Sequence, residues 1–218
     1  MKKFSIPFVL FVCFIMFTAA LKFVDVQPVG PMDSEVGFAT VNVFVHNLFG
    51  QNKVYDRISD FLAVLSLFAA CSFAIIGAYQ LLQKKSILKV DSSIILLGVT
   101  YVFVILIYVL FEKLVINFRP VLEKGVLEAS YPSSHTMMIL IILGTARTTM
   151  ERIIHNELVL KGLRIVLAVL MVLAVAFRIM SGVHWFTDIL GALFISAAVI
   201  QLYNSLYKSV VAVENQIK

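Results

Sequence analysis

Charged residues and cysteines are scarce in this sequence, and each shortage excludes a class of protein. Charged side chains make up 14% of the 218 residues and hydrophobic side chains 61%, and the mean hydropathy is +0.97. A chain this apolar is not a soluble domain, and its length leaves no room for two large domains. We therefore predict one membrane-embedded domain over residues 1–218.

The two cysteines, Cys13 and Cys71, both lie within apolar runs. Two cysteines at such positions do not form a disulfide framework, and a structural metal centre needs more ligands than they offer. Asp, Glu and His are also not clustered with the spacing of a two-metal catalytic site. We therefore expect two small buried cysteines, and a protein without a metal or another cofactor.

The N-terminal segment lacks the cleavage pattern of a secretory leader. Met1-Lys2-Lys3 precedes the apolar run Ser5–Phe23, which is longer than the apolar part of a typical signal peptide and is not closed by an A-x-A-like site. The sequence also has no internal repeat, low-complexity segment or linker to a second domain. We interpret the run as the first membrane span.

Long apolar runs are abundant. A helix needs about 20 residues to cross a hydrocarbon core of about 30 Å. Six segments approach that length: Ser5–Phe23, Asp60–Leu82, Ser93–Phe111, Thr136–Thr149, Ile165–Met180 and Phe186–Tyr203. The fourth is the shortest, and we expect it to extend back to Ser133. The predicted fold is all-α, a six-helix transmembrane bundle.

Basic residues gather on one side of these predicted spans. Eleven of the eighteen lie there: Lys2, Lys3, Lys84, Lys85, Lys89, Arg147, Arg152, Lys161, Arg164, Lys208 and Lys218. The positive-inside rule then places both termini in the cytoplasm. Because the basic residues lie at span ends, the net charge of +5 does not indicate a nucleic-acid partner.

The segment Val24–Arg57 between the first two spans carries a further helical pattern. Asp33-Ser34 can cap a helix in which apolar residues recur opposite Asn42 and His46. The apolar positions are Phe38, Val41, Val45, Leu48 and Phe49. We predict a short amphipathic helix on the outer membrane surface, with His46 solvated. Packing against the ends of the bundle is the alternative.

Three polar clusters interrupt the apolar pattern. They are Lys113 to Arg119-Pro120, Tyr131-Pro-Ser-Ser-His-Thr136, and Arg178 to His184 and Asp188. Each has a structural interpretation by itself: a basic rim that reaches the membrane surface, a hydroxyl-capped helix start, and a satisfied buried polar network. Ionisable groups at membrane depth cost several kcal/mol, however, and by default they indicate a functional site.

The predicted topology places all three clusters at the outer ends of their spans. His184 and Asp188 are four residues apart, so the carboxylate can accept the imidazole Nδ1–H and leave Nε2 free. Together the clusters offer cations, two histidines and a helix N-terminus, which suit a phosphate. Phosphoryl transfer depends mostly on positioning and electrostatic stabilisation, so we expect metal-free chemistry.

The three clusters resemble the signature motifs of the type 2 phosphatidic acid phosphatase superfamily, which are integral membrane lipid-phosphate phosphatases. The resemblance lies in Arg119-Pro120, Pro132-Ser133-Ser134-His135 and Arg178-x5-His184-x3-Asp188. It implies that His184 is the nucleophile, that Asp188 orients it, and that His135 protonates the leaving group and then activates water. It also implies that Arg119, Arg178, Ser133 and Ser134 bind the phosphate, assisted by Lys113.

The sequence departs from the family pattern at three positions. Lys113 lies six residues before Arg119, where the family spaces this lysine by seven, and Glu112 occupies the expected place. On a straight helix this shift turns Lys113 by about 100°. Ser134 replaces the usual glycine, and Phe177 replaces a serine before Arg178, so one hydroxyl contact is missing.

We therefore expect a multi-pass cell-membrane phosphatase whose active site faces the extracytoplasmic side. Its expected substrate is a lipid phosphomonoester or lipid pyrophosphate, and undecaprenyl pyrophosphate, phosphatidic acid and phosphatidylglycerol phosphate are all admissible. Two alternatives remain. One is a phosphotransferase that passes the phosphoryl group to a second lipid, and the other is a non-catalytic transporter or binding protein. The sequence does not indicate an oligomeric state.

Overall fold

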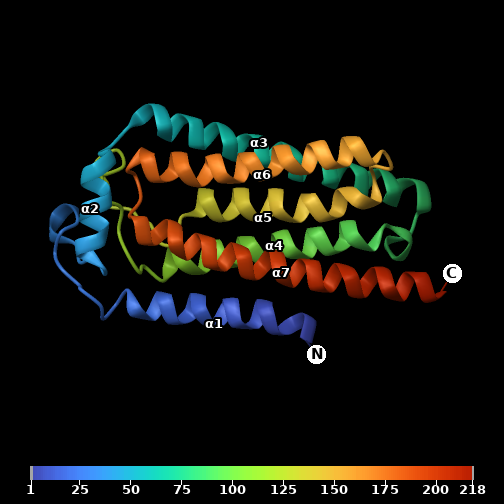
Figure 1. Cartoon of the computed structure of the whole chain (residues 1–218), viewed down its shortest axis with the longest axis horizontal. Coiled ribbons are helices and arrows are strands. Elements are labelled where there is room, and N and C mark those ends of the chain that lie inside the picture. The colour runs from blue at the N-terminus through green and yellow to red at the C-terminus, as the bar shows by residue number, and fades with distance from the viewer. Residues whose placement is uncertain (1, 218) are drawn as a thin grey trace.

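The computed structural model describes residues 2–217 and is built from seven α-helices (Figure 1). These are α1 (Ser5–Ala20), α2 (Ala39–Phe49), α3 (Lys53–Lys84), α4 (Ser92–Lys113), α5 (Ser134–Thr149), α6 (Glu157–Ser181) and α7 (Phe186–Ile217). Extended pairing within the described residues is limited to isolated bridges in the loops. Lys218, one of the basic residues used for orientation, lies outside the described part of the chain.

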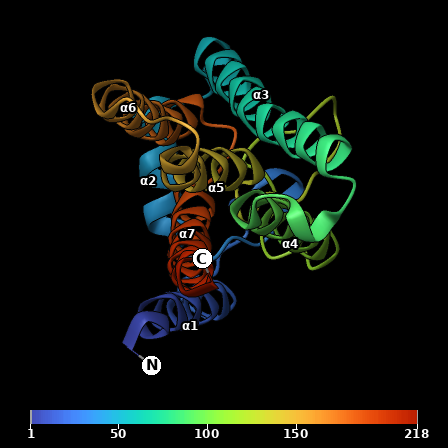
Figure 2. The same cartoon turned by 90° about the vertical axis from the view of Figure 1, so that its right-hand side faces the viewer.

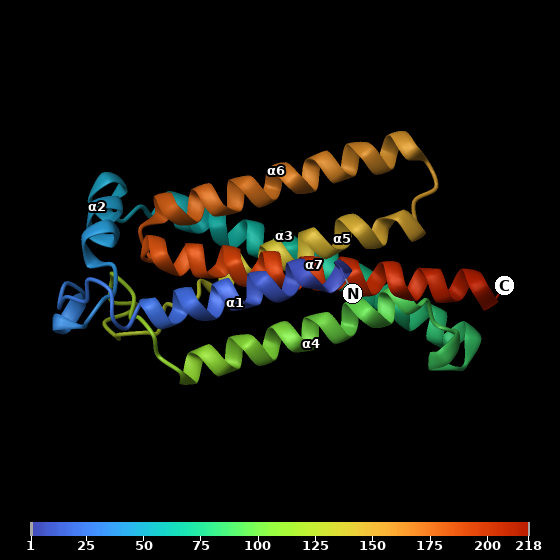
Figure 3. The same cartoon turned by 60° about the horizontal axis from the view of Figure 1, so that its bottom comes forward.

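Six of the helices run along the long axis of the molecule, and α2 lies across one end (Figures 1 and 3). Viewed down that axis, α5 lies between α3, α4, α6 and α7 (Figure 2). Eleven of its 16 residues are buried, which makes α5 the central helix. A helix in this position contacts protein on most sides, so its sequence need not be as apolar as that of a lipid-facing helix.

Four described helices, α3, α4, α6 and α7, are long and apolar enough to cross a membrane. The first predicted span appears as the shorter apolar helix α1. The fourth appears as α5, whose 16 residues measure about 24 Å against a hydrocarbon core of about 30 Å. Both short helices pack against α7. The all-helical class is confirmed, whereas the count of six spans stays a prediction.

Helix α3 begins at Lys53, well before the predicted span at Asp60. Its start is fixed by Asn52, whose side-chain oxygen accepts hydrogen bonds from the Val54 and Tyr55 amides at 2.9 and 3.3 Å. Such a cap satisfies amide groups that have no partner within the helix. The early start places a polar first section of α3 at the same end of the bundle as α2.

Two expectations about side-chain burial are wrong. Cys71 is exposed and Cys13 half-buried, because α1 and α3 lie at the edge of the bundle and turn much of their surface outward. His46 is half-buried instead of solvated, and its ring lies 5.6 Å from the Trp185 ring. Burial lowers the pKa of His46.

Helix α2 differs from its prediction in its start, and its place on the membrane surface stays a prediction. It begins after Phe38, which has a left-handed φ of 50°, whereas Asp33 belongs to a separate 3-10 turn, Pro31–Asp33. The predicted cap at Asp33-Ser34 is therefore wrong. The polar side packs inward, because buried Asn42 donates to Gly37 O and Thr187 Oγ1 at 2.8 and 2.9 Å. The apolar side, with Val41, Phe44 and Leu48, is exposed.

Candidate active site

A four-residue connection between α6 and α7 brings Arg178 against His184. The connection starts at Gly182, which adopts φ 65° and ends α6 in the left-handed conformation that favours glycine. A side chain there would also collide with the backbone of Gly50. The resulting tight turn places Arg178 Nη2 2.9 Å from His184 Nε2.

The Asp188 carboxylate lies beside the other nitrogen of the same imidazole. Its Oδ2 is 3.5 Å from His184 Nδ1, a contact longer than a hydrogen bond. The carboxylate is fully buried and is held by the Trp185 amide at 3.0 Å and by Asn117 Nδ2 at 3.2 Å. Because Arg178 can only donate, Nε2 of neutral His184 accepts and the proton resides on Nδ1, facing Asp188.

The electrostatic surroundings keep the His184 imidazole uncharged. Burial, and then the positive charges of Arg178 and Arg119, lower the pKa of His184 well below its usual range. A neutral imidazole retains a lone pair on the nitrogen that faces the site, as a nucleophile requires.

His135 faces the same arginine from the start of α5. The Ser133 amide donates to Asp188 O at 3.0 Å and so joins the start of α5 to the start of α7. Arg178 Nη2 then lies 3.3 Å from His135 Nδ1. One guanidinium nitrogen therefore contacts both histidines. Arg178 is only 2% exposed, and its Nη1 donates to Asp56 Oδ1 at 2.9 Å.

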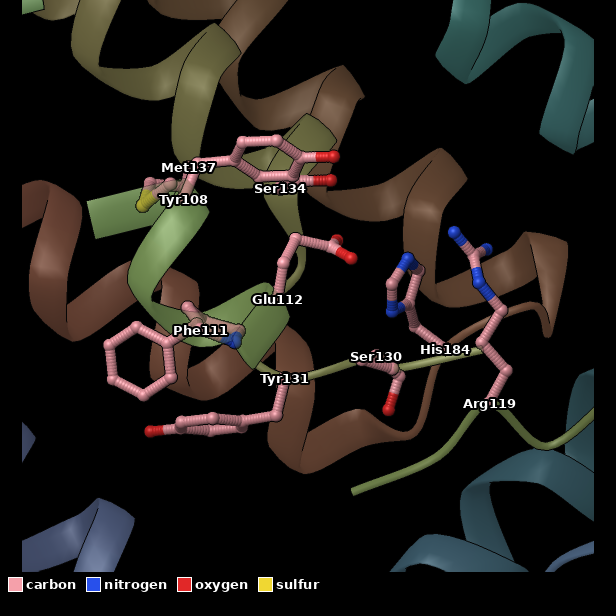
Figure 4. A pocket seen from close by; sticks show the side chains of 11 residues that line it. Tyr108, Phe111, Glu112, Arg119, Ser130, Tyr131, Ser134, Met137 and His184 are labelled. Carbon is pink, nitrogen blue, oxygen red and sulfur yellow. The ribbon is translucent and has the colours of Figure 1, made fainter. Parts of the chain in front are cut away.

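A small cavity adjoins these groups (Figure 4). Its lining residues come from α4, α5 and the two loops that carry the motifs: Tyr108, Phe111, Glu112, Arg119, Ala129, Ser130, Tyr131, Pro132, Ser134, Met137 and His184. Its volume of about 20 Å³ has room for about one water molecule.

Arg119 and the two serines occupy different positions around this cavity. Arg119 lines it and pairs with Glu128 Oε2 at 3.3 Å, while the preceding Phe118 accepts a hydrogen bond from the Trp185 indole at 2.8 Å. Ser134 also lines the cavity. Ser133 is fully buried, and its hydroxyl lies 3.1 Å from that of Thr136. The Ser133 amide is engaged by Asp188 O, so phosphate binding by Ser133 stays a prediction.

Glu112, and not Lys113, lines the cavity. Helix α4 continues regularly to Lys113, so successive side chains point about 100° apart, as the shifted spacing predicts. Lys113 is exposed, whereas the Glu112 carboxylate is directed toward His184 across the cavity (Figure 4). Phosphate binding by Lys113 stays a prediction, with its side chain outside the cavity lining.

An apolar groove continues from the cavity toward the middle of the bundle. A pocket of about 260 Å³ shares Tyr108, Ser134 and Met137 with the cavity and is also lined by His135. A second pocket of about 230 Å³ follows it between α3, α4 and α5, and shares Val104 with the first. Apolar residues line most of both pockets, so they suit a hydrocarbon chain.

Four polar residues at this site were missed by the sequence analysis: Asp56, Asp60, Glu112 and Asn117. Asp60 Oδ1 lies 3.3 Å from His135 Nε2. The signal for the two aspartates was available, because both are acidic residues at the start of an apolar run and are four positions apart. Asn117 lies within the first motif segment, but its partner Asp188 is known only from the tertiary structure.

The fold and the site together define an all-helical membrane protein with a cluster of cations, histidines and carboxylates at one end. The PAP2 superfamily model matches residues 94–211, more than half of the chain, and the chain belongs to this superfamily. The resemblance stated from the motifs is therefore confirmed. No curated protein sequence matches the chain.

Among solved structures, the chain is similar to the crystal structure of a transmembrane PAP2-type phosphatidylglycerolphosphate phosphatase from Bacillus subtilis. The TM-score is 0.68 at 18% identity, over 96% of this chain and 98% of the other. The likeness establishes that the two proteins share a fold. It also extends beyond the family match, because α1, α2 and α3 are included in the covered length.

Proposed function

We propose that this protein is a membrane phosphatase that hydrolyses a lipid phosphomonoester or lipid pyrophosphate through a phosphohistidine at His184. One observation carries the proposal: Arg178 Nη2 contacts both His184 Nε2 and His135 Nδ1, at 2.9 and 3.3 Å. The two imidazoles therefore flank the group that would hold a phosphoryl oxygen. This is the arrangement needed for a nucleophile on one side of phosphorus and a proton donor on the other.

The first chemical step would transfer the phosphoryl group to His184. Its Nε2 attacks phosphorus, the bond to the lipid oxygen breaks, and His135 gives a proton to that oxygen as it leaves. Arg119, Arg178 and the amides at the start of α5, including that of Ser134, bind the three remaining oxygens. When a phosphate dianion takes up the donors of Arg178, its negative charge also favours protonation of His135.

In the second step the phosphohistidine would be hydrolysed. His135, now neutral, accepts a proton from water while the water oxygen attacks phosphorus and the bond to His184 Nε2 breaks. Asp188, fixed by Trp185 and Asn117, stabilises the charge that His184 carries between the steps. Every proton transfer in this sequence uses a side chain of the protein, so we propose a metal-independent reaction.

The groove between α3, α4 and α5 supports a lipid substrate. The first of its two pockets is lined by His135, the second adjoins the first, and both are lined mainly by apolar side chains. A phosphate at the cavity would leave the attached hydrocarbon chain within reach of this groove. The end of the bundle opposite the site carries most of the basic residues, and such an end favours the cytoplasm. We therefore propose that the site faces the extracytoplasmic side and that both termini are cytoplasmic.

A panel of lipid phosphates tests the proposal. Purified protein in detergent is supplied with phosphatidic acid, phosphatidylglycerol phosphate or undecaprenyl pyrophosphate, and released phosphate is measured. We expect release from at least one lipid. Transfer of phosphate to an added second lipid would instead indicate a phosphotransferase, and no turnover of any lipid would favour a transporter or binding protein.

A further inference from the structure

Asp60 contacts the proposed acid and base, although it lies outside all three motifs and outside the family match at residues 94–211. It belongs to α3, which the motif pattern does not include. Its carboxylate Oδ1 lies 3.3 Å from Nε2 of His135, at the edge of the ring opposite the nitrogen that faces Arg178. The inference below rests on the proposed function.

The hydrogen-bonding roles around this ring fix its tautomer. Arg178 donates to His135 Nδ1 at 3.3 Å, and an arginine has no acceptor. A neutral His135 therefore carries its proton on Nε2, where the Asp60 carboxylate can accept it. Nδ1 is left facing Arg178 and the phosphate site.

The position of Asp60 in α3 is not explained by helix stability. Acidic residues in a first turn are favoured by the helix dipole, which accounts for Asp56. Asp60 lies one turn further on, where that effect has decayed, and it directly precedes an apolar span. Asp60 lies one turn before buried Ala63, at the edge of the buried stripe of α3 that also includes Ser59 and Ser66. Its side chain stays 56% exposed, yet its carboxylate reaches His135.

We propose that Asp60 is a positioning residue for His135, holding the Nε2 edge of the ring so that Nδ1 faces the phosphoryl group. It also offsets the positive charge that the ring gains while it carries a proton. The other charged groups around the ring are Arg178, Arg119 and Asp56. Asp56 is engaged by Arg178, so Asp60 is the carboxylate left to the ring itself.

Formation and breakdown of phosphohistidine provide a test. Breakdown needs His135 for every substrate, whereas formation needs it only when the leaving group must be protonated. With dioctanoyl phosphatidic acid the leaving group is the alkoxide of dioctanoylglycerol, which needs a proton. With 4-nitrophenyl phosphate it is 4-nitrophenolate, which is stable without one. Purified full-length Asp60→Asn protein is assayed on both compounds, and labelled phosphohistidine is quantified. We expect kcat on the lipid to fall about 10- to 100-fold, the scale of a lost charged hydrogen bond, with little change in KM.

On 4-nitrophenyl phosphate the Asp60→Asn protein should form phosphohistidine at nearly the wild-type rate and then accumulate it. Breakdown still needs His135 to accept a proton from water, so the steady rate should fall. Asp60→Glu should restore part of the rate. Asp33→Asn is the matched control: it makes the same charge change at an exposed position in the segment between α1 and α2, and should behave as wild type.

Three outcomes would overturn the inference. They are wild-type kcat on the lipid for Asp60→Asn, an equal loss in formation and breakdown of phosphohistidine on 4-nitrophenyl phosphate, and a loss of thermal stability that alone accounts for lower activity. Thermal unfolding of Asp60→Asn and Asp33→Asn in one detergent measures the last. If wild-type protein neither releases phosphate nor labels His184, the proposed function itself fails, which is a distinct result.

Discussion

Two histidine–aspartate pairs face each other across Arg178, and they differ in burial. In the pair of His184 and Asp188, the side chains are 2% and 0% exposed. In the pair of His135 and Asp60, they are 32% and 56% exposed. The first pair is sealed within the protein, whereas the second is open to solvent.

The difference in burial matches the two tasks that we propose. A nucleophile must keep one tautomer and one orientation through the reaction, and a buried carboxylate held by two hydrogen bonds provides both. An acid and base must exchange protons with a leaving group and then with water. Partial exposure of His135 provides that access. Asp60, its partly exposed partner, can adjust its position as the charge of the His135 ring changes.

The largest effect is expected from His184→Ala. Removal of the nucleophile should abolish turnover, because the proposed covalent intermediate forms on its Nε2 and His135 is needed as the acid and base. Acid-labile, base-stable phosphate trapped on the wild-type protein should be absent from the variant. Retention of more than a few per cent of the activity, by protein that extracts and unfolds like wild type, would contradict the assignment.

Arg178→Lys tests whether both pairs depend on their shared arginine. A lysine keeps one charge but lacks the planar fork that contacts Asp56 and both histidines. We expect kcat/KM to fall by roughly 10²-fold or more, on the scale of two lost charge-assisted hydrogen bonds. Steady-state kinetics on one lipid phosphate measure it, and activity within threefold of wild type would mean that a point charge suffices.

Asp188→Asn tests the buried pair by itself. Loss of the charge that stabilises the phosphorylated imidazole should lower kcat roughly 10²- to 10⁴-fold, while KM changes much less. The measurement is kcat and KM beside Asp60→Asn in the same detergent. A smaller loss for Asp188→Asn than for Asp60→Asn would reverse the order that burial predicts.

Lys113→Ala should have a small effect. Its side chain is exposed and lies outside the cavity lining, so we expect a loss within about 0.5 kcal/mol of transition-state stabilisation, as for most surface substitutions. Arg119→Ala is the control, because Arg119 lines the cavity and its loss should be severe. If the ratio of kcat/KM values for wild type and Lys113→Ala corresponds to a loss of about 1.5 kcal/mol or more, Lys113 contacts the phosphate.

The smallest effect is expected from chelation. All proposed steps use protein side chains, so incubation with EDTA should leave phosphate release unchanged, and vanadate should inhibit by adopting the trigonal-bipyramidal geometry of the transferring phosphoryl group at His184. Activity lost with EDTA and restored by Mg²⁺ or Zn²⁺ would contradict the metal-free mechanism and the roles of both pairs.

The helical class and the family were predictable because their signals are local. Apolar runs predicted the approximate positions of the six helices that lie along the axis, although α7 continues to Ile217, well beyond the predicted end at Tyr203, and α1 ends at Ala20 instead of Phe23. Helix starts were less predictable, because α3 depends on the Asn52 cap and α2 on a left-handed Phe38. The orientation of α2 also depended on a partner, since Asn42 is buried by its hydrogen bonds to Thr187 and Gly37.

The same distinction separates the two pairs. His184 and Asp188 are four residues apart, and the sequence was sufficient to predict that they lie close together. They do not share a helix face, however, because His184 lies in the connection before α7 and Asp188 in the first turn of α7, where the Trp185 amide holds its carboxylate. His135 and Asp60 belong to different helices, and only the packing of α3 beside α5 brings them within 3.3 Å. A sequence specifies neighbours a few residues apart through local backbone geometry, whereas neighbours between helices depend on how all the buried side chains pack together.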